Sequence, residues 1–97
     1  MTHPTIAAIA TAPGQAAVAI VRLSGPEAFA IAARISSRPA EALVPGRIVH
    51  AWILDGEPGD AERPTVDEVI LLPFRAPRSF TGEDVVEIHC HGGTYVT

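Results

Sequence analysis

The sequence predicts an α+β domain with a mixed or antiparallel β-sheet of about five strands and one or two helices. Two observations lead to this fold class. Five short apolar segments are separated by Gly- and Pro-containing turns, a pattern typical of strands. A sixth segment, between the second and third of them, has helical spacing instead. The length of 97 residues is enough for one small domain.

The first two strands are expected at Thr5–Thr11 and Ala16–Leu23, which are rich in Ala, Ile and Val. The turn signal at residues 12–15, Ala-Pro-Gly-Gln, lies between them. The second segment has the composition of a strand that is covered on both faces. Arg22 interrupts its apolar character near the end. This arginine either covers the core with its apolar stem or contacts an anion.

A helix is predicted after Ser24-Gly25-Pro26-Glu27. The serine can cap the first N–H groups of a helix, the glutamate can return a hydrogen bond to it, and the proline suits the first turn. The next apolar residues share one helical face: Ala28, Ile31, Ala32 and Ile35. We expect the helix to end near Ser36-Ser37, ahead of Pro39.

Three further strands are expected at Ile48–Leu54, Val66–Phe74 and Asp84–His91. The first two of these are joined by a polar loop at Asp55–Pro64, which is rich in acids, Gly and Pro. The fourth strand is apolar on both faces over Val69–Leu72, which is typical of a strand inside a sheet.

Composition excludes several classes of site. The positive charge is carried by seven arginines and no lysine, which excludes a P-loop lysine and a Schiff-base lysine. The net charge is −4: residues 1–48 hold four Arg against two Glu, and residues 49–97 hold three Arg against nine acids. Such a chain is a poor candidate for binding nucleic acid by itself. The single cysteine, Cys90, favours a cytoplasmic location.

The fifth strand separates its side chains by parity. Three are expected to face the core, namely Val86, Ile88 and Cys90, and four the other way, namely Val85, Glu87, His89 and His91. The second face is either a solvated surface or a polar site. Glu87, His89 and His91 also have a spacing that a metal could use, which leaves a small metal-binding enzyme as an alternative. A purely structural dimerisation module is a third interpretation.

Three segments carry a resemblance to a known family: Thr5–Thr11 followed by Pro13-Gly14, Ile20–Gly25, and the eighteen residues Ala76–Gly93. They resemble the N-terminal domain of the tRNA modification GTPases called MnmE or TrmE. The resemblance implies a fold similar to the tetrahydrofolate-binding domain of the glycine cleavage T-protein group. Residues 1–97 would then be a C-terminally truncated folate-binding and dimerisation domain. The helical and GTPase domains would lie beyond it, so that this chain alone is expected to hydrolyse no GTP.

The resemblance also implies a function for the whole protein. It would hydrolyse GTP with Mg²⁺ and K⁺, and would modify C5 of the wobble uridine of certain tRNAs together with the flavoprotein MnmG (GidA). The N-terminal domain would bind a one-carbon-substituted tetrahydrofolate, such as 5-formyltetrahydrofolate, and form a cytoplasmic homodimer without a membrane anchor.

Two folate contacts follow from matching motifs in that family. Arg22 matches the arginine of an R-[IL]-S-G segment, and Glu87 matches the second glutamate of a G-E-D-V-x-E segment. A carboxylate can accept the 2-amino group and the ring N–H of a pterin together, which is the role we expect for Glu87. No catalytic residue and no metal ligand is predicted. Gln15-Ala16-Ala17 departs from the Arg-Gly-Gly usual in the family, which stiffens that loop and removes a charge.

Overall fold

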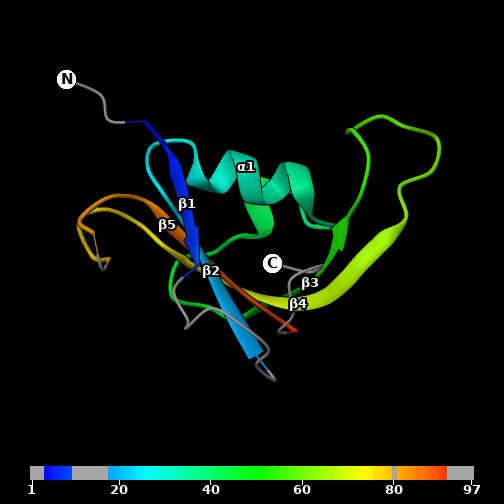
Figure 1. Ribbon diagram of the computed structural model, residues 1–97. Coiled ribbons are helices and arrows are strands. Elements are labelled where there is room, and N and C mark those ends of the chain that lie inside the picture. Colours follow the sequence, from blue (N-terminus) through cyan, green and yellow to red (C-terminus); the bar gives the residue numbers. More distant parts are fainter. Residues whose placement is uncertain (1–3, 10–17, 80, 92–97) are drawn as a thin grey trace.

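The computed structural model describes residues 4–9, 18–79 and 81–91 of the chain. Its elements follow the order β1 (Ile6–Ile9), β2 (Val18–Ser24), α1 (Ala28–Ile35), a short 3₁₀ helix η1 (Ala40–Ala42), β3 (Val49–Leu54), β4 (Thr65–Phe74) and β5 (Val85–His91) (Figure 1). The strands form one sheet in the order β1-β2-β5-β4-β3, and each of these neighbours pairs antiparallel. The predicted α+β class is confirmed. Of the two arrangements left open, mixed or antiparallel, the described strands adopt the antiparallel one.

The strand that comes last in the described chain lies at the centre of the sheet. β5 pairs with β2 along one edge and with β4 along the other. In this register Glu87 lies opposite Arg22 on β2 and opposite Leu72 on β4. Residues far apart in the sequence thereby become cross-strand neighbours, whose side chains are close enough to interact.

One face of the sheet packs against α1 and holds the hydrophobic core (Figure 1). The core combines alternate side chains of the strands with one side of the helix: Ala19, Leu23, Ala28, Phe29, Ala32, Leu43, Ala51, Val69, Leu71, Val86, Ile88 and Cys90. The parity predicted for the fifth strand is confirmed, because Val86, Ile88 and Cys90 are all in this core. The helical face is confirmed as well, with Phe29 as a buried member that the spacing did not include.

The start of the helix differs from the prediction. α1 begins at Ala28, and no side chain caps its first turn. Ser24 is instead the last residue of β2, and its hydroxyl lies 2.7 Å from that of Thr81. The backbone N–H of Glu27 donates to Oγ1 of Thr5 at 2.9 Å. The prediction of a capping box is therefore wrong. β2 continues one residue further than expected, and the hydroxyl of Thr5, rather than that of Ser24, accepts a backbone N–H just before the helix.

The strand positions agree closely with the prediction in the second half of the chain, where β3, β4 and β5 begin within one residue of their expected starts. The end of α1 at Ile35, followed by Ser36, is also as predicted. The expected turn at residues 12–15, the departing residues Gln15-Ala16-Ala17, and Gly92-Gly93 lie outside the described residues. Among the described residues, no helix has the length and apolar character needed to span a bilayer.

Candidate functional site

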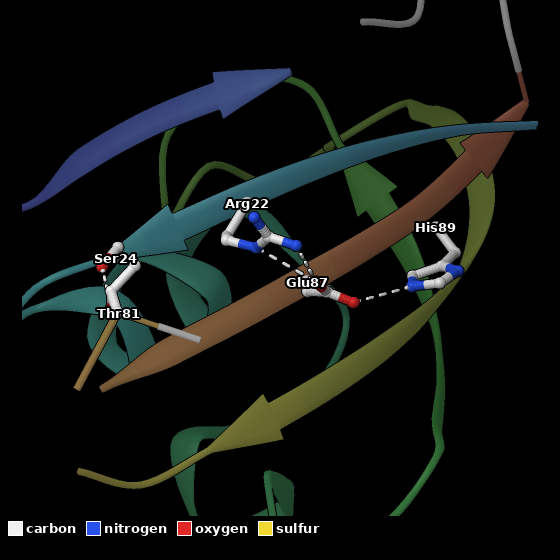
Figure 2. A network of polar contacts seen from close by, with 5 residues as sticks. All are labelled: Arg22, Ser24, Thr81, Glu87 and His89. Atoms are coloured by element: carbon white, nitrogen blue, oxygen red, sulfur yellow. Dashed lines mark hydrogen bonds and ion pairs between the residues drawn. The ribbon is translucent and has the colours of Figure 1, made fainter. Parts of the chain in front are cut away.

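The two residues that the motifs single out as ligand contacts bind each other directly (Figure 2). Arg22 donates to Oε2 of Glu87 through Nε at 3.0 Å and through Nη2 at 2.6 Å. The two residues lie opposite one another on β2 and β5. The register of the sheet itself therefore places the guanidinium beside the carboxylate.

Glu87 is a buried charge, with 6 % of its surface exposed. Burial alone would raise the pKa of its carboxyl group. The hydrogen bonds and positive charges of Arg22 and His89 outweigh that effect and hold the pKa below its ordinary value of 4.5. The carboxylate is consequently ionised at neutral pH and acts only as a hydrogen-bond acceptor.

His89 completes a network of three side chains with Arg22 and Glu87. Its Nε2 lies 3.2 Å from Oε1 of Glu87, the oxygen that Arg22 does not use (Figure 2). His89 is two residues further along β5, so it shares the face of Glu87. Each carboxylate oxygen has two lone pairs. Oε2 already accepts two N–H groups, whereas Oε1 retains acceptor capacity.

A second polar contact ties the loop before β5 to the same part of the sheet. The hydroxyl groups of Ser24 and Thr81 are 2.7 Å apart (Figure 2). Ser24 lies two residues after Arg22 on β2 and therefore on the same face. The backbone N–H of Gly25 also donates to the carbonyl of Asp84 at 2.9 Å. These contacts hold the loop against the end of β2 that carries Arg22.

His91 shares the face of Glu87 but forms a separate pair with Asp67 of β4. Its Nδ1 lies 2.6 Å from Oδ1 of Asp67, and its backbone N–H donates to Oδ2 at 2.8 Å. Burial alone would raise the pKa of Asp67. The hydrogen bonds and charge of His91 outweigh this effect, so the pKa of Asp67 is lowered. Within the described ranges, no three His, Cys, Asp or Glu side chains gather closely enough to hold a metal ion. The set Glu87, His89 and His91 therefore does not converge on one ion.

A cavity of about 430 Å³ adjoins the network. It shares His89 with the network and is also lined by Val18, His50, Glu68, Ile70 and His91. Its volume lies in the range of pockets that take small molecules. His50 and Glu68 contact each other across β3 and β4. Sequence reasoning missed both residues, because they come from strands whose pairing the sequence does not reveal.

The face of the sheet away from α1 also exposes apolar side chains around the network. Val18 is 54 % exposed and Ile70 is 42 % exposed. Both residues share this face with His89 and line the cavity beside it. A polar cluster surrounded by exposed apolar surface is typical of a face that binds a ligand or a partner.

Cys90 takes no part in the polar network, although it is among the residues that line the cavity. It is buried in the core, on the opposite face of β5, and its Sγ lies 3.5 Å from the carbonyl of Ala19. Burial, together with the nearby charge of Asp67, raises the pKa of its thiol. A thiol with a raised pKa is a weak nucleophile at neutral pH, which agrees with its predicted role as a small buried apolar residue.

Comparison with known proteins gives consistent matches over nearly the whole chain. The family described as "GTP-binding protein TrmE N-terminus" matches residues 5–97. The tRNA modification GTPase MnmE of Synechococcus sp. (strain WH7803) is 50 % identical over 92 residues, which are 92 % of this chain and 19 % of that protein. The proteins of the same name from Chlamydia felis and Thermotoga petrophila are 52 % and 45 % identical, over 96 % and 95 % of this chain and 20 % and 19 % of theirs. The chain thus spans about a fifth of the length of these curated relatives.

Proposed function

The chain belongs to the MnmE (TrmE) family of tRNA modification GTPases, as its N-terminal part, and we propose that this part binds a one-carbon-substituted tetrahydrofolate and forms a homodimer. The observation that carries the folate proposal is the placement of Arg22 and Glu87. Both matched motif positions lie side by side on the neighbouring strands β2 and β5, and the carboxylate is ionised although it is buried. A buried charge next to a cavity is more characteristic of a binding site than of a solvated surface.

The chemistry of Glu87 suits a pterin. The 2-amino group and a ring N–H of a pterin are adjacent donors, and an ionised carboxylate can accept both. Oε1 has a free lone pair for the first of these donors. Acceptance by both oxygens requires Arg22 to leave Oε2, so we propose that ligand binding turns the guanidinium from the carboxylate toward an acceptor of the ligand, either the pterin carbonyl or the glutamate tail.

His89 and the neighbouring cavity would complete the binding region. His89 lines the cavity and also forms a hydrogen bond with Oε1 of Glu87, which would orient the carboxylate. The cavity offers an apolar wall at Val18 and Ile70, against which the flat part of a ligand can pack. The tetrahydrofolate would supply a one-carbon unit, while the residues of this chain bind and orient it.

For the whole protein we propose the activity that its relatives' names describe, the modification of tRNA coupled to GTP hydrolysis. The finer proposal is that it acts on C5 of the wobble uridine together with the flavoprotein MnmG (GidA), in the cytoplasm. The GTP, Mg²⁺ and K⁺ sites would lie outside these 97 residues, because the sequence has neither a lysine nor a G-x-x-x-x-G-K-[ST] motif.

Calorimetric titration of the purified chain with 5-formyltetrahydrofolate tests the folate proposal. We expect saturable binding with one ligand per chain and no dependence on added metal. Absence of binding at millimolar ligand would contradict the proposal and would favour the third interpretation, a purely structural dimerisation module. Titration with Zn²⁺ in the same instrument serves as the control for the metal alternative.

A further inference from the structure

A second cavity lies at the opposite end of β4 from the Asp67–His91 pair and shares no residue with the first cavity. It has a volume of about 410 Å³ and is lined by residues 45–46 of the connector before β3 and by residues 74–78 at the end of β4. Two arginines, Arg75 and Arg78, belong to its wall, and Arg47 follows the lining residue Gly46 directly. Two of the seven arginines of an otherwise acidic chain thereby line one cavity, and a third is the sequence neighbour of a lining residue.

The wall of this cavity is fixed by many hydrogen bonds. Arg75 donates to Oδ2 of Asp84 at 2.9 Å, and its guanidinium lies 3.9 Å from the centre of the Phe29 ring. The other oxygen of Asp84 accepts the backbone N–H of Ala76 at 3.0 Å. The backbone N–H of Arg78 donates to the carbonyl of Arg75 at 2.9 Å, which closes the turn. Asp84 neutralises Arg75, so Arg75 acts as a support of the wall rather than as a free charge.

Arg78 has a different environment. In the described part of the chain its guanidinium has no hydrogen bond and no ion pair, although its backbone is held in the turn. The same holds for the side chain of Arg47. A preorganised backbone that presents an unpaired guanidinium at a cavity is suited to an anion, and the planar fork of arginine matches phosphate.

The remaining lining identifies the kind of phosphate compound. Phe74, Pro45 and Pro77 give the cavity an apolar wall beside the arginines. A sugar or base attached to a phosphate can pack against such a wall, whereas inorganic phosphate gains nothing from it. We infer that this cavity binds a backbone phosphate of RNA, with Arg78 as the principal contact. This inference rests on the proposed function, since the relatives are named as tRNA modification enzymes.

The net charge of −4 explains why such a contact has to be local. The acidic remainder of the chain repels a polyanion, and salt screens that repulsion over about 10 Å at 0.1 M ionic strength. Phosphate contacts position an RNA without reading its sequence. The cavity would therefore help to hold a tRNA rather than select its wobble base.

The test is fluorescence anisotropy of a labelled, unmodified tRNA transcript titrated with the 97-residue chain between 50 and 200 mM KCl. Arg78→Ala should weaken binding by roughly five- to twentyfold and lower the slope of log K against log salt by about 1. Arg78→Lys, which retains the charge, should recover part of the loss. The matched control is Arg34→Ala on α1, which removes the same charge from an exposed side chain elsewhere and should change binding less than about twofold.

Three results would overturn the inference. The first is no binding of the tRNA by the unchanged chain at millimolar protein, and the second is equal affinity of Arg78→Ala and the unchanged chain. The third is binding of inorganic phosphate as tight as that of uridine 5′-monophosphate at the backbone amides of this cavity in NMR titrations, because the apolar wall would then contribute nothing. The folate proposal fails separately, because Arg78→Ala should leave the 5-formyltetrahydrofolate titration unchanged and Glu87→Gln should leave tRNA binding unchanged.

Discussion

Arg22 and Glu87 are 65 residues apart in the chain but lie directly opposite each other in the sheet, where the guanidinium donates two hydrogen bonds to one carboxylate oxygen. The pair is unequal in burial. The side chain of Glu87 is 8 % exposed and that of Arg22 is 30 % exposed. The buried carboxylate therefore needs the arginine to compensate its charge, whereas water can still solvate part of the guanidinium.

Replacement of Arg22 by Ala should destabilise the fold. It leaves the buried charge of Glu87 with His89 as its only side-chain partner among the described contacts. Because Arg22 is partly solvated, the cost should be below that of a fully buried pair, at about 1–3 kcal/mol. Urea unfolding followed by circular dichroism measures it. Arg34→Ala is the control, with a change of less than about 0.5 kcal/mol expected. An Arg22→Ala protein as stable as the unchanged chain would mean that solvent compensates Glu87.

The stability of the chain should depend on pH through Glu87. Its pKa is lower in the folded chain than its ordinary value of 4.5, so the folded state binds the proton less tightly than the unfolded state. The stabilisation is therefore complete above pH 4.5 and is lost as the pH falls through the lower pKa of the folded state. Urea midpoints of the unchanged chain and of Glu87→Gln, measured between pH 7 and pH 3, should converge on acidification. A constant difference at all pH values is incompatible with this origin.

Gly25, between β2 and α1, should tolerate no side chain. Its φ is +140°, and a Cβ atom there would lie 2.5 Å from the Cα of Thr5. Gly25→Ala should cost about 3 kcal/mol or more, because backbone strain adds to a clash with Thr5, the residue directly before β1. Gly46 is the matched control, since it also has a positive φ but has open space around it. Gly46→Ala should cost only about 1 kcal/mol. Equal losses in thermal or urea unfolding would contradict the steric argument.

The sequence alone predicts most of the strands and the parity of β5, because alternation and turn residues act locally. Val86 and Cys90 are in the core and Glu87 is on the other face, as a period of two requires. The family motifs also identify Arg22 and Glu87 as a related pair of positions. Their direct contact follows only from the strand order β2-β5-β4, which places the last strand at the centre.

Other features depend on contacts that no local pattern encodes. The capping box at Ser24 is a sound local signal, but the pairing of β2 with β5 extends to Ser24 and takes that residue into the sheet. His50 and Glu68 remain unremarkable in the sequence, because their proximity results from the register of β3 and β4. In the sequence, Arg78 likewise resembles any other loop residue. Only the fold brings the turn after Arg75 and the connector at Gly46 to one cavity.

We expect the chain to form a homodimer at micromolar concentration, with twice the monomer mass of 10.2 kDa in sedimentation equilibrium. A small domain buries a modest core, and the exposed apolar face around Ile70 offers additional area. Ile70→Glu should therefore raise the dissociation constant by roughly tenfold or more, because it places a charge in an apolar interface. Val44→Glu, an equally exposed position in the connector before β3, should have no effect. A purely monomeric chain would contradict this prediction.

Replacement of Glu87 by Gln should weaken the binding of reduced folate while keeping the fold. The side chain keeps its size, and the amide oxygen can still accept from Arg22. One acceptor oxygen becomes an NH₂ group, which would face the donors of the pterin. Loss of one charge-assisted bidentate pair should cost about 1.5–3 kcal/mol, or roughly ten- to a hundredfold in affinity.

Glu87→Gln is a cleaner test than Arg22→Ala, because the arginine also contributes its stem to the packing of β2. Calorimetric titration of both proteins with 5-formyltetrahydrofolate measures the effect. Glu41→Gln, in η1 on the helical side of the molecule, removes the same charge from an exposed position and should leave the affinity unchanged. If Glu87→Gln binds as tightly as the unchanged chain, the Arg22–Glu87 pair only joins two strands. The pterin would then have to find its acceptors elsewhere on the sheet.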